Sequence, residues 1–209
     1  MKIVALSDTH SRHHQLAVPD GDILIHAGDA TMSGSVNEIA VFNAWLGTLP
    51  HPVKLFCAGN HDWLFERSLG LARSLLTNAT YLQDELIVVN GLRIYASPWQ
   101  TRFFDWAFNL DRGLPLRRKW DLIPDDLDVL VTHSPPFGIR DQNPNGEHCG
   151  CEELRAAVER VKPRLHIFGH IHQGYGELVY EGTRFVNACN CTEQYQPLNA
   201  PLVFELEPK

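Results

Sequence analysis

Short apolar runs alternate with polar, glycine-containing turns along this chain, and each run has the length of a buried strand. The first three runs span residues 2–7, 22–29 and 53–58. Ser35 and Glu38 match a helix capping box, and apolar positions recur at helical spacing over residues 36–49. A second helix is expected after the third run, continuing to about residue 76. This strand–helix rhythm predicts parallel strands joined by crossover helices.

The second half of the chain mixes hairpins with further strand–helix units. Asn90-Gly91 separates two apolar runs within residues 81–97 and is a strong signal for a hairpin turn. Further elements are expected as strands at 129–132 and 165–168, a helix at 152–162, a strand pair around 181–182 and a closing strand near 201–204. Periodicity alone therefore supports an α/β or α+β fold with one core.

Composition narrows the class of protein. A chain of 209 residues with 44% hydrophobic and 21% charged residues is expected to form one globular domain, residues 1–209. The net charge of -7 gives no electrostatic reason to expect a long nucleic acid as partner. The first apolar run is too short for a signal peptide, and no run is long enough to span a bilayer, so we expect a cytoplasmic protein without a membrane partner.

The five cysteines are an odd number, which fits a reducing compartment better than a disulfide framework. Four of them form two close pairs, Cys149 with Cys151 and Cys189 with Cys191. A four-thiolate zinc site usually has two to four residues between paired cysteines, and here there is one. We therefore interpret these residues as partly buried thiols.

Residue types that bind metals recur where strands give way to loops. These positions are Asp8 and His10, Asp29, Asn60 with His61 and Asp62, His133, and His170 with His172. In an extended backbone, residues i and i+2 point to the same side, so an Asp-x-His pair can bind one ion, and the two histidines of His-x-His converge on one side. Glycine precedes several of these positions and allows the chain to turn sharply there. By contrast, His26 is expected to be a core histidine, and His13 and His14 to be exposed.

Five short motifs in this order, Asp-x-His, Gly-Asp, Gly-Asn-His-Asp, a lone His after a strand, and Gly-His-x-His, closely resemble the calcineurin-like metallophosphoesterase superfamily. Further segments around residues 95–99, 106–109 and 150–154, together with Asn187-Ala188-Cys189, resemble its metallophosphoesterase-domain-containing group, the 239 family, whose members look like class III cyclic-nucleotide phosphodiesterases. Some members of that group lack the first histidine of the last motif and work poorly as enzymes, whereas this chain has His170.

The resemblance implies a four-layer sandwich, with two mixed β-sheets face to face and helices outside. It also implies two divalent ions. One would be held by Asp8, His10, Asp29 and His172, and the other by Asp29, Asn60, His133 and His170. The donor set of oxygen and imidazole, without thiolate, suits manganese first, with iron, zinc, nickel or magnesium as alternatives.

A mechanism follows from two such ions. Such ions would lower the pKa of a bridging water, and the resulting hydroxide would attack phosphorus in line. His61 is the candidate general acid for the leaving alkoxide, and Asp62 either orients His61 or starts the following helix.

The leading hypothesis is a phosphodiesterase acting on a small phosphoester, such as a cyclic nucleotide. The alternatives are a phosphomonoesterase or phosphoprotein phosphatase, and a non-catalytic binding scaffold with the same fold. Loops 98–115 and 138–150 carry aromatic and polar residues that would decide the substrate if they line the site. The sequence does not indicate the native metal or the oligomeric state.

Overall fold

The computed structural model describes residues 1–208, and its first β-sheet comes mainly from the N-terminal third of the chain. This sheet contains β1 (Lys2–Leu6), β2 (Ile23–His26), β3 (Val53–Phe56), β4 (Thr80–Tyr81) and β13 (Leu202–Glu205). The order is β13-β1-β2-β3-β4, in which β1 to β4 are parallel and β13 is antiparallel to β1. The parallel strands therefore all deliver their following loops to the same edge.

The second sheet is built from later segments. It contains β5 (Glu85–Val89), β6 (Leu92–Ser97), β9 (Val129–Thr132), β10 (Leu165–Phe168), β11 (Gly176–Tyr180) and β12 (Thr183–Asn187). Its order is β11-β12-β10-β9-β6-β5, with four parallel central strands and antiparallel strands at both edges. The hairpin predicted at Asn90-Gly91 joins β5 to β6.

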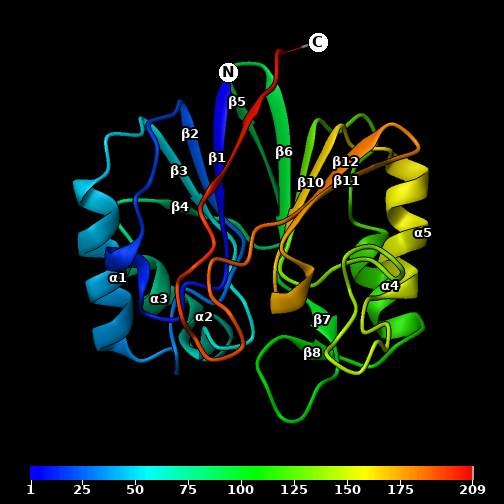
Figure 1. Ribbon diagram of the computed structural model, residues 1–209, viewed down its shortest axis with the longest axis horizontal. Coiled ribbons are helices and arrows are strands. Elements are labelled where there is room, and N and C mark those ends of the chain that lie inside the picture. The colour runs from blue at the N-terminus through cyan, green and yellow to red at the C-terminus, as the bar shows by residue number, and fades with distance from the viewer. Residues whose placement is uncertain (209) are drawn as a thin grey trace.

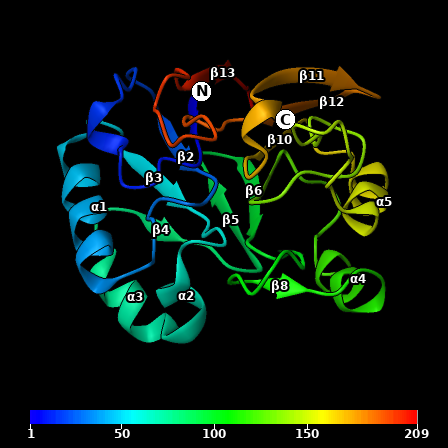
Figure 2. The same ribbon diagram turned by 60° about the horizontal axis from the view of Figure 1, so that its bottom comes forward.

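Helices cover the outer face of each sheet (Figure 1). Beside the first sheet lie α1 (Val36–Thr48), α2 (Trp63–Arg67) and α3 (Leu69–Leu75), and beside the second lie α4 (Leu114–Trp120) and α5 (Glu152–Val161). The turned view in Figure 2 shows the same separation of the two helix groups. This arrangement confirms the predicted sandwich of two mixed sheets with helices outside.

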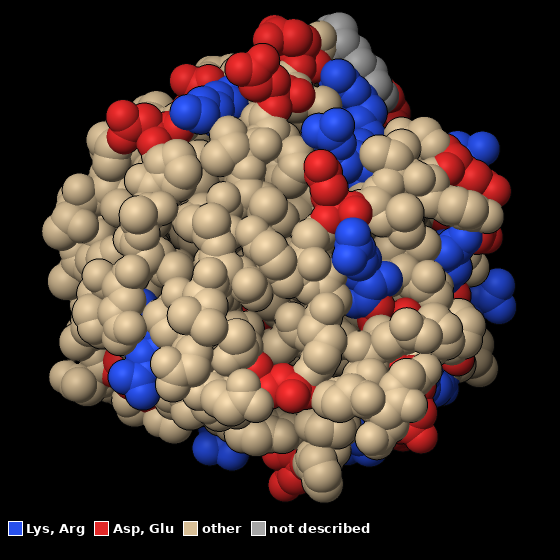
Figure 3. Space-filling model, viewed as in Figure 1, with Lys and Arg blue, Asp and Glu red and all other residues tan. Residues whose placement is uncertain are grey.

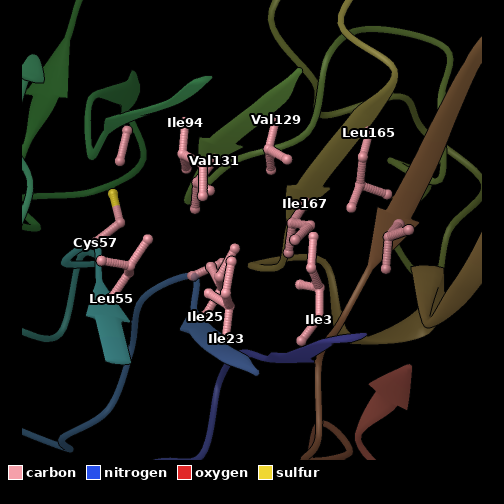
Figure 4. Packing of buried hydrophobic residues seen from close by; sticks show 14 of the residues in the cluster. Ile3, Ile23, Ile25, Leu55, Cys57, Ile94, Val129, Val131, Leu165 and Ile167 are labelled. Atoms are coloured by element: carbon pink, nitrogen blue, oxygen red, sulfur yellow. The ribbon is translucent and has the colours of Figure 1, made fainter. Parts of the chain in front are cut away.

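The main core lies between the two sheets. Ile3, Ile23 and Ile25 point from the first sheet toward Val131 and Ile167 of the second (Figure 4), and all five are essentially inaccessible to solvent. Two further apolar clusters fill the spaces between each sheet and its helices. Strands buried on both faces explain why the sequence shows continuous apolar runs rather than strict alternation.

The predicted capping box of α1 is present: Glu38 N–H donates to Ser35 Oγ, and Ser35 N–H donates to Glu38 Oε2. The prediction of a single helix reaching residue 76 is wrong, because the chain breaks into α2 and α3 at Ser68, whose φ of -151° and ψ of 63° are not helical. Serine followed shortly by Gly70 is a weak helix former, which accounts for the break.

Two further expectations differ from the structure. Residues 98–115 are not an irregular loop throughout, because they contain a small parallel pair, β7 (Gln100–Thr101) and β8 (Asn109–Leu110). They also contain the start of α4, whose Pro115 in the first turn is a helix-start signal. His13 is buried against Phe42 and Trp45 rather than exposed.

Other expectations hold. His26 is a buried core histidine whose Nε2 lies 3.0 Å from Thr9 Oγ1, and His14 is exposed. Across residues 1–208, none of the helices combines the length and apolar character needed to cross a bilayer.

Candidate metal centre

All nine side chains singled out in the sequence lie in loops that follow parallel strands. They come after β1, β2 and β3 in the first sheet and after β9 and β10 in the second. The side chains that line a common cavity of about 730 Å³ are His10, Asp29, Asn60, His61, His170 and His172. The other three, Asp8, Asp62 and His133, are fully buried. The carboxyl ends of parallel strands are the usual ligand-binding edge of such sheets.

Asp29 lies between two groups of candidate ligands. Its Oδ2 is 3.9 Å from Nε2 of His10 and 3.4 Å from Nε2 of His133. Its Oδ1 accepts a hydrogen bond of 2.8 Å from the backbone N–H of His61. The Nε2 of His133 also lies 2.9 Å from Oδ1 of Asn60. One carboxylate oxygen therefore faces imidazoles from both sheets.

The two carboxylate oxygens of Asp8 differ in their hydrogen bonding. Oδ2 accepts hydrogen bonds from Ser7 Oγ at 2.5 Å and from the backbone N–H of His170 at 2.9 Å. Oδ1 is buried and has no hydrogen-bond partner of good geometry among the described residues, although His172 Nε2 and His10 Nε2 lie 3.3 and 3.8 Å from it. A buried carboxylate oxygen without a partner is costly, and a cation at this point would satisfy it.

Four of the candidate ligands have left-handed backbone conformations. The φ values are 53° at Asp8, 42° at His10, 54° at Asp29 and 67° at His170. The expectation that residues i and i+2 converge through extended backbone is therefore wrong for both pairs, Asp8 with His10 and His170 with His172. Their side chains are brought together by tight turns that non-glycine residues rarely adopt, and such strain concentrates at functional sites.

The glycines beside the ligands are required for space. A Cβ atom at Gly59 would meet Oδ1 of Asp29, one at Gly169 would meet Oδ2 of Asp8, and one at Gly28, whose φ is 105°, would meet Nδ1 of His133. All three separations would fall under 3.0 Å, closer than real Cβ atoms come to their neighbours. Each glycine thus permits the backbone to approach a candidate ligand more closely than any side chain would allow.

Burial raises the pKa of both carboxyl groups, Asp8 and Asp29, but the nearby histidines more than offset it and hold both pKa values well below the usual range. Burial lowers the pKa of His10 to about 4 and that of His170 to about 3, against the opposing pull of the two carboxylates. At neutral pH the carboxylates are ionised and these imidazoles are neutral, which are the forms that ligate metals.

The pKa of His133 is shifted in the opposite direction from the pKa values of His10 and His170. Burial lowers its pKa, but the charge of Asp29 and the hydrogen bond with it raise the pKa to about 9. Its Nδ1 donates to the carbonyl of Ala27 at 3.0 Å, which leaves Nε2 directed at Asp29 and Asn60. A metal ion at Nε2 would replace the proton there, as is usual when histidine becomes a ligand.

Together these residues fit divalent ions. Among the described residues, two tight groups that could hold a metal share no residue. One is Asp8 with His172 and Cys189, and the other is Asp29 with His133 and His170. A third group joins His10, Asp29 and His61. Carboxylate, amide and imidazole donors suit first-row divalent metals, and the unpartnered oxygen of Asp8 is the clearest sign of a cation position.

His61 is oriented by the backbone rather than by Asp62. Its Nδ1 donates to the carbonyl of Met32 at 2.7 Å, because a carbonyl can only accept. The ring packs against the indole of Trp106, with centroids 4.2 Å apart and planes 32° apart, and meets the ring of His10 edge-on at 4.8 Å. This leaves Nε2 of His61 as the ring nitrogen without a protein hydrogen bond among the described residues.

Asp62 instead ties two ligand-bearing loops together. Its carboxylate accepts hydrogen bonds from the backbone N–H groups of Ala30, Thr31 and Gly59 and from Thr31 Oγ1 at 2.7 Å. Burial and the charge of Asp29 raise its pKa to about 6. Asp62 is also the residue before α2, but its side chain makes no capping hydrogen bond to that helix.

Both loops left undecided by the sequence line the cavity. Residues 98–115 contribute Phe103 and Trp106, and residues 138–150 contribute Asn143 and His148. Arg112 joins the loops, since its Nη1 donates to the carbonyl of Gly150 at 2.9 Å. The cavity therefore has walls of mixed aromatic and polar character.

Sequence patterns assigned no function to three parts of this site: the Met32 carbonyl, Cys189 and Tyr195. Cys189 Sγ lies 3.1 Å from Oδ2 of Asp8, and the ring of Tyr195 lies 4.7 Å from that of His10. No group of potential metal ligands among residues 1–208 brings together the four paired cysteines, so the four-thiolate zinc site is not formed.

A sequence model of the family described as calcineurin-like phosphoesterase matches residues 1–174. The chain belongs to that family. The human protein named metallophosphoesterase domain-containing protein 1 is 45% identical over 98% of this chain and 71% of its own length. A Caenorhabditis elegans UPF0046 protein is 40% identical over 99% of this chain and 81% of its own length.

Solved structures show the same fold at low sequence identity. The crystal structure of TT1561 from Thermus thermophilus aligns with a TM-score of 0.61 and 14% identity, and covers 89% of this chain and 88% of that one. Membership of the calcineurin-like family places the chain among metal-dependent phosphoester hydrolases.

Proposed function

We propose that this calcineurin-like phosphoesterase binds two divalent ions and hydrolyses small phosphodiesters, such as 2′,3′- or 3′,5′-cyclic nucleotides. The observation that carries the proposal is the position of Asp29 Oδ2 between His10 and His133, at the floor of a cavity of about 730 Å³. A cavity of this size accepts a molecule as large as a nucleotide.

The ligand sets follow from the two sides of Asp29. Asp8, His10 and His172 would complete one site, and Asn60, His133 and His170 would complete the other. When bound, the two ions would supply Lewis acidity to the phosphoryl oxygens and lower the pKa of a shared water. Manganese is the first candidate, with iron, zinc, nickel or magnesium as alternatives.

The chain's own residues would handle the leaving group. His61, held by the Met32 carbonyl and packed against Trp106, presents Nε2 to the cavity side of the cluster. In its doubly protonated form it would donate the Nε2 proton to the departing alkoxide. A well-placed acid of this kind contributes ~10²–10⁴-fold in rate.

The walls of the cavity favour a diester with an organic group on each side of phosphorus. Phe103 is half exposed at the cavity and lies 6.2 Å from His170 between ring centroids. Tyr195 lies at 4.7 Å from His10 on another part of the lining. Aromatic rings beside a phosphate site can stack on a nucleobase.

Surface charge supports a small substrate rather than a long polyanion. On the face drawn in Figure 3, basic and acidic side chains are interspersed and form no continuous basic stripe. The net charge of -7 also disfavours binding of a long polyanion. We also propose that the protein acts in the cytoplasm.

The test is turnover by the purified protein supplied with Mn²⁺. We expect hydrolysis of bis-p-nitrophenyl phosphate and of at least one cyclic nucleotide to exceed that of p-nitrophenyl phosphate. Faster turnover of the monoester would favour the phosphomonoesterase alternative. Metal binding without turnover of any ester would favour a binding scaffold.

A further inference from the structure

The segment of residues 188–195 follows β12 and contacts Asp8, His10 and His172, the candidate ligands of one proposed ion. It lies beyond residues 1–174, the part of the chain matched by the family model. Figure 1 shows this orange stretch crossing from the second sheet toward the loops after β1. Its contacts with Asp8, His172 and His10 give it a specific task.

Cys189 contacts the carboxylate of Asp8. Its thiol donates to Oδ2 at 3.1 Å, and Cys189 is completely buried. Ser7 Oγ and the backbone N–H of His170 donate to the same oxygen. Three donors on Oδ2 fix the plane of the carboxylate and leave the unpartnered Oδ1 directed toward His172 and His10.

The backbone holds Cys189 in this place through contacts with both sheets. Ala188 N–H donates to Phe168 O at the end of β10, and Asn190 N–H donates to Ser7 O at the end of β1, both at 2.8 Å. A second hydrogen bond joins the same two residues, because Asn190 Oδ1 accepts from Ser7 N–H at 3.2 Å. These hydrogen bonds connect the residues on both sides of Cys189 to the two sheets.

The same segment supports the other two ligands of this ion. The carbonyl of Thr192 accepts a hydrogen bond of 2.8 Å from Nδ1 of His172, which directs Nε2 of that ring toward Asp8. The ring of Tyr195 meets that of His10 at 4.7 Å and 68°. His133, a candidate ligand of the other ion, is held in a similar way by a different segment, because its Nδ1 donates to Ala27 O in the loop after β2.

We propose that Cys189, the Thr192 carbonyl and the ring of Tyr195 support the Asp8, His10 and His172 site from outside, and that Cys189 is a positioning residue that orients Asp8 through its thiol. This inference rests on the two-ion site proposed above. Groups that hold metal ligands in place typically change metal affinity by ~10–100-fold when removed. Removal of one of these supporting groups should therefore lower the affinity for one ion more than for the other.

The experiment compares Cys189→Ala with Cys189→Ser by equilibrium dialysis against buffered Mn²⁺, followed by elemental analysis. We expect Cys189→Ala to keep one ion at wild-type affinity and to bind the other ~10–100-fold more weakly. Cys189→Ser retains a donor and should bind both ions with nearly wild-type affinity. Cys189→Val fills the space without a donor and should resemble the alanine variant, so loss of folding by one variant leaves the comparison intact.

Cys191→Ala is the matched control. Cys191 is a buried thiol of the same segment, but its Sγ lies 3.6 Å from Thr9 O and makes no hydrogen bond to a candidate ligand side chain. We expect this control to bind two ions as the wild type does. Equal weakening in Cys191→Ala and Cys189→Ala would assign the effect to packing and overturn the positioning role.

Other results would also overturn the inference. Two ions with unchanged affinities in both Cys189→Ala and Cys189→Val would show that the thiol does not position Asp8. A metal–sulfur distance of about 2.3 Å in X-ray absorption of the wild type would make Cys189 a ligand instead. Fewer than two ions in the wild type would overturn the two-ion proposal and this inference with it.

Discussion

At the scale of single residues, Asp29 has the most demanding position. Its Oδ2 faces imidazoles delivered by two different sheets, while its Oδ1 is held by the backbone of His61. Every other candidate ligand belongs to one side of the cluster. The consequences of substitution should therefore differ between Asp29 and its neighbours.

We expect Asp29→Ala to lose both ions, because each site would lose a charged oxygen. His172→Ala should weaken mainly one ion, since Nε2 of His172 lies beside Asp8 and not beside Asn60 or His133. Elemental analysis of the dialysed proteins measures this directly as ions per chain. Two ions bound per chain of Asp29→Ala would rule out its bridging position.

Substitution of His61 should reduce turnover without reducing metal binding. We expect His61→Ala to retain both ions, while the rate of diester hydrolysis falls ~10²–10⁴-fold because the leaving oxygen lacks its proton donor. The loss should be smaller for a substrate with a good leaving group, such as a p-nitrophenyl ester. An equal loss for good and poor leaving groups would contradict the acid role.

At the scale of elements, the strand-to-loop turns determine how closely the ligands approach one another. These turns combine left-handed backbone at the ligands with glycines that leave no room for a side chain. The sequence showed the glycines, and the structure shows which atoms they make room for. Substitution at such a glycine should disturb the ligand next to it more than it disturbs the element.

We expect Gly169→Ala to lower the free energy of unfolding by about 1–3 kcal/mol, because its Cβ would meet Asp8 Oδ2 and Ser7 Oγ. It should also weaken the ion at Asp8. The control Gly70→Ala lies on exposed α3 with no atom within 4 Å of the new Cβ, and should stabilise the chain by about 0.5–1 kcal/mol. Urea unfolding of the metal-free proteins measures both, and unchanged stability of Gly169→Ala would contradict the close approach.

At the scale of the whole molecule, packing helices on the outer face of the second sheet buries a histidine beside Phe168 and Phe185. His166 lies in β10 with Nε2 2.9 Å from Thr132 Oγ1, and its Nδ1 has no partner among the described residues. Burial lowers its pKa to about 3. The folded chain therefore excludes a proton that the unfolded chain binds once the pH falls below about 6.5.

This difference predicts a loss of stability in acid. A base whose folded pKa is depressed has no effect above the unfolded pKa of about 6.5, and it destabilises the fold progressively as pH falls toward the folded pKa of about 3. Between pH 7 and pH 5, His166 should account for about 2 kcal/mol of the loss. We expect His166→Gln to show a correspondingly smaller loss in urea unfolding at the two pH values, and an identical loss would contradict it.

The sequence by itself determined the long strands of both sheets, the capped helix α1, the Asn90-Gly91 hairpin and the residue types at the strand ends. These depend on neighbours along the chain, through side-chain periodicity and turn chemistry. The tertiary structure decided which ligands meet and what orients them. Cys189 and Asp8 are 181 positions apart, and the Met32 carbonyl carries no side-chain signal. Such contacts depend on sheet order and packing, which local patterns do not encode.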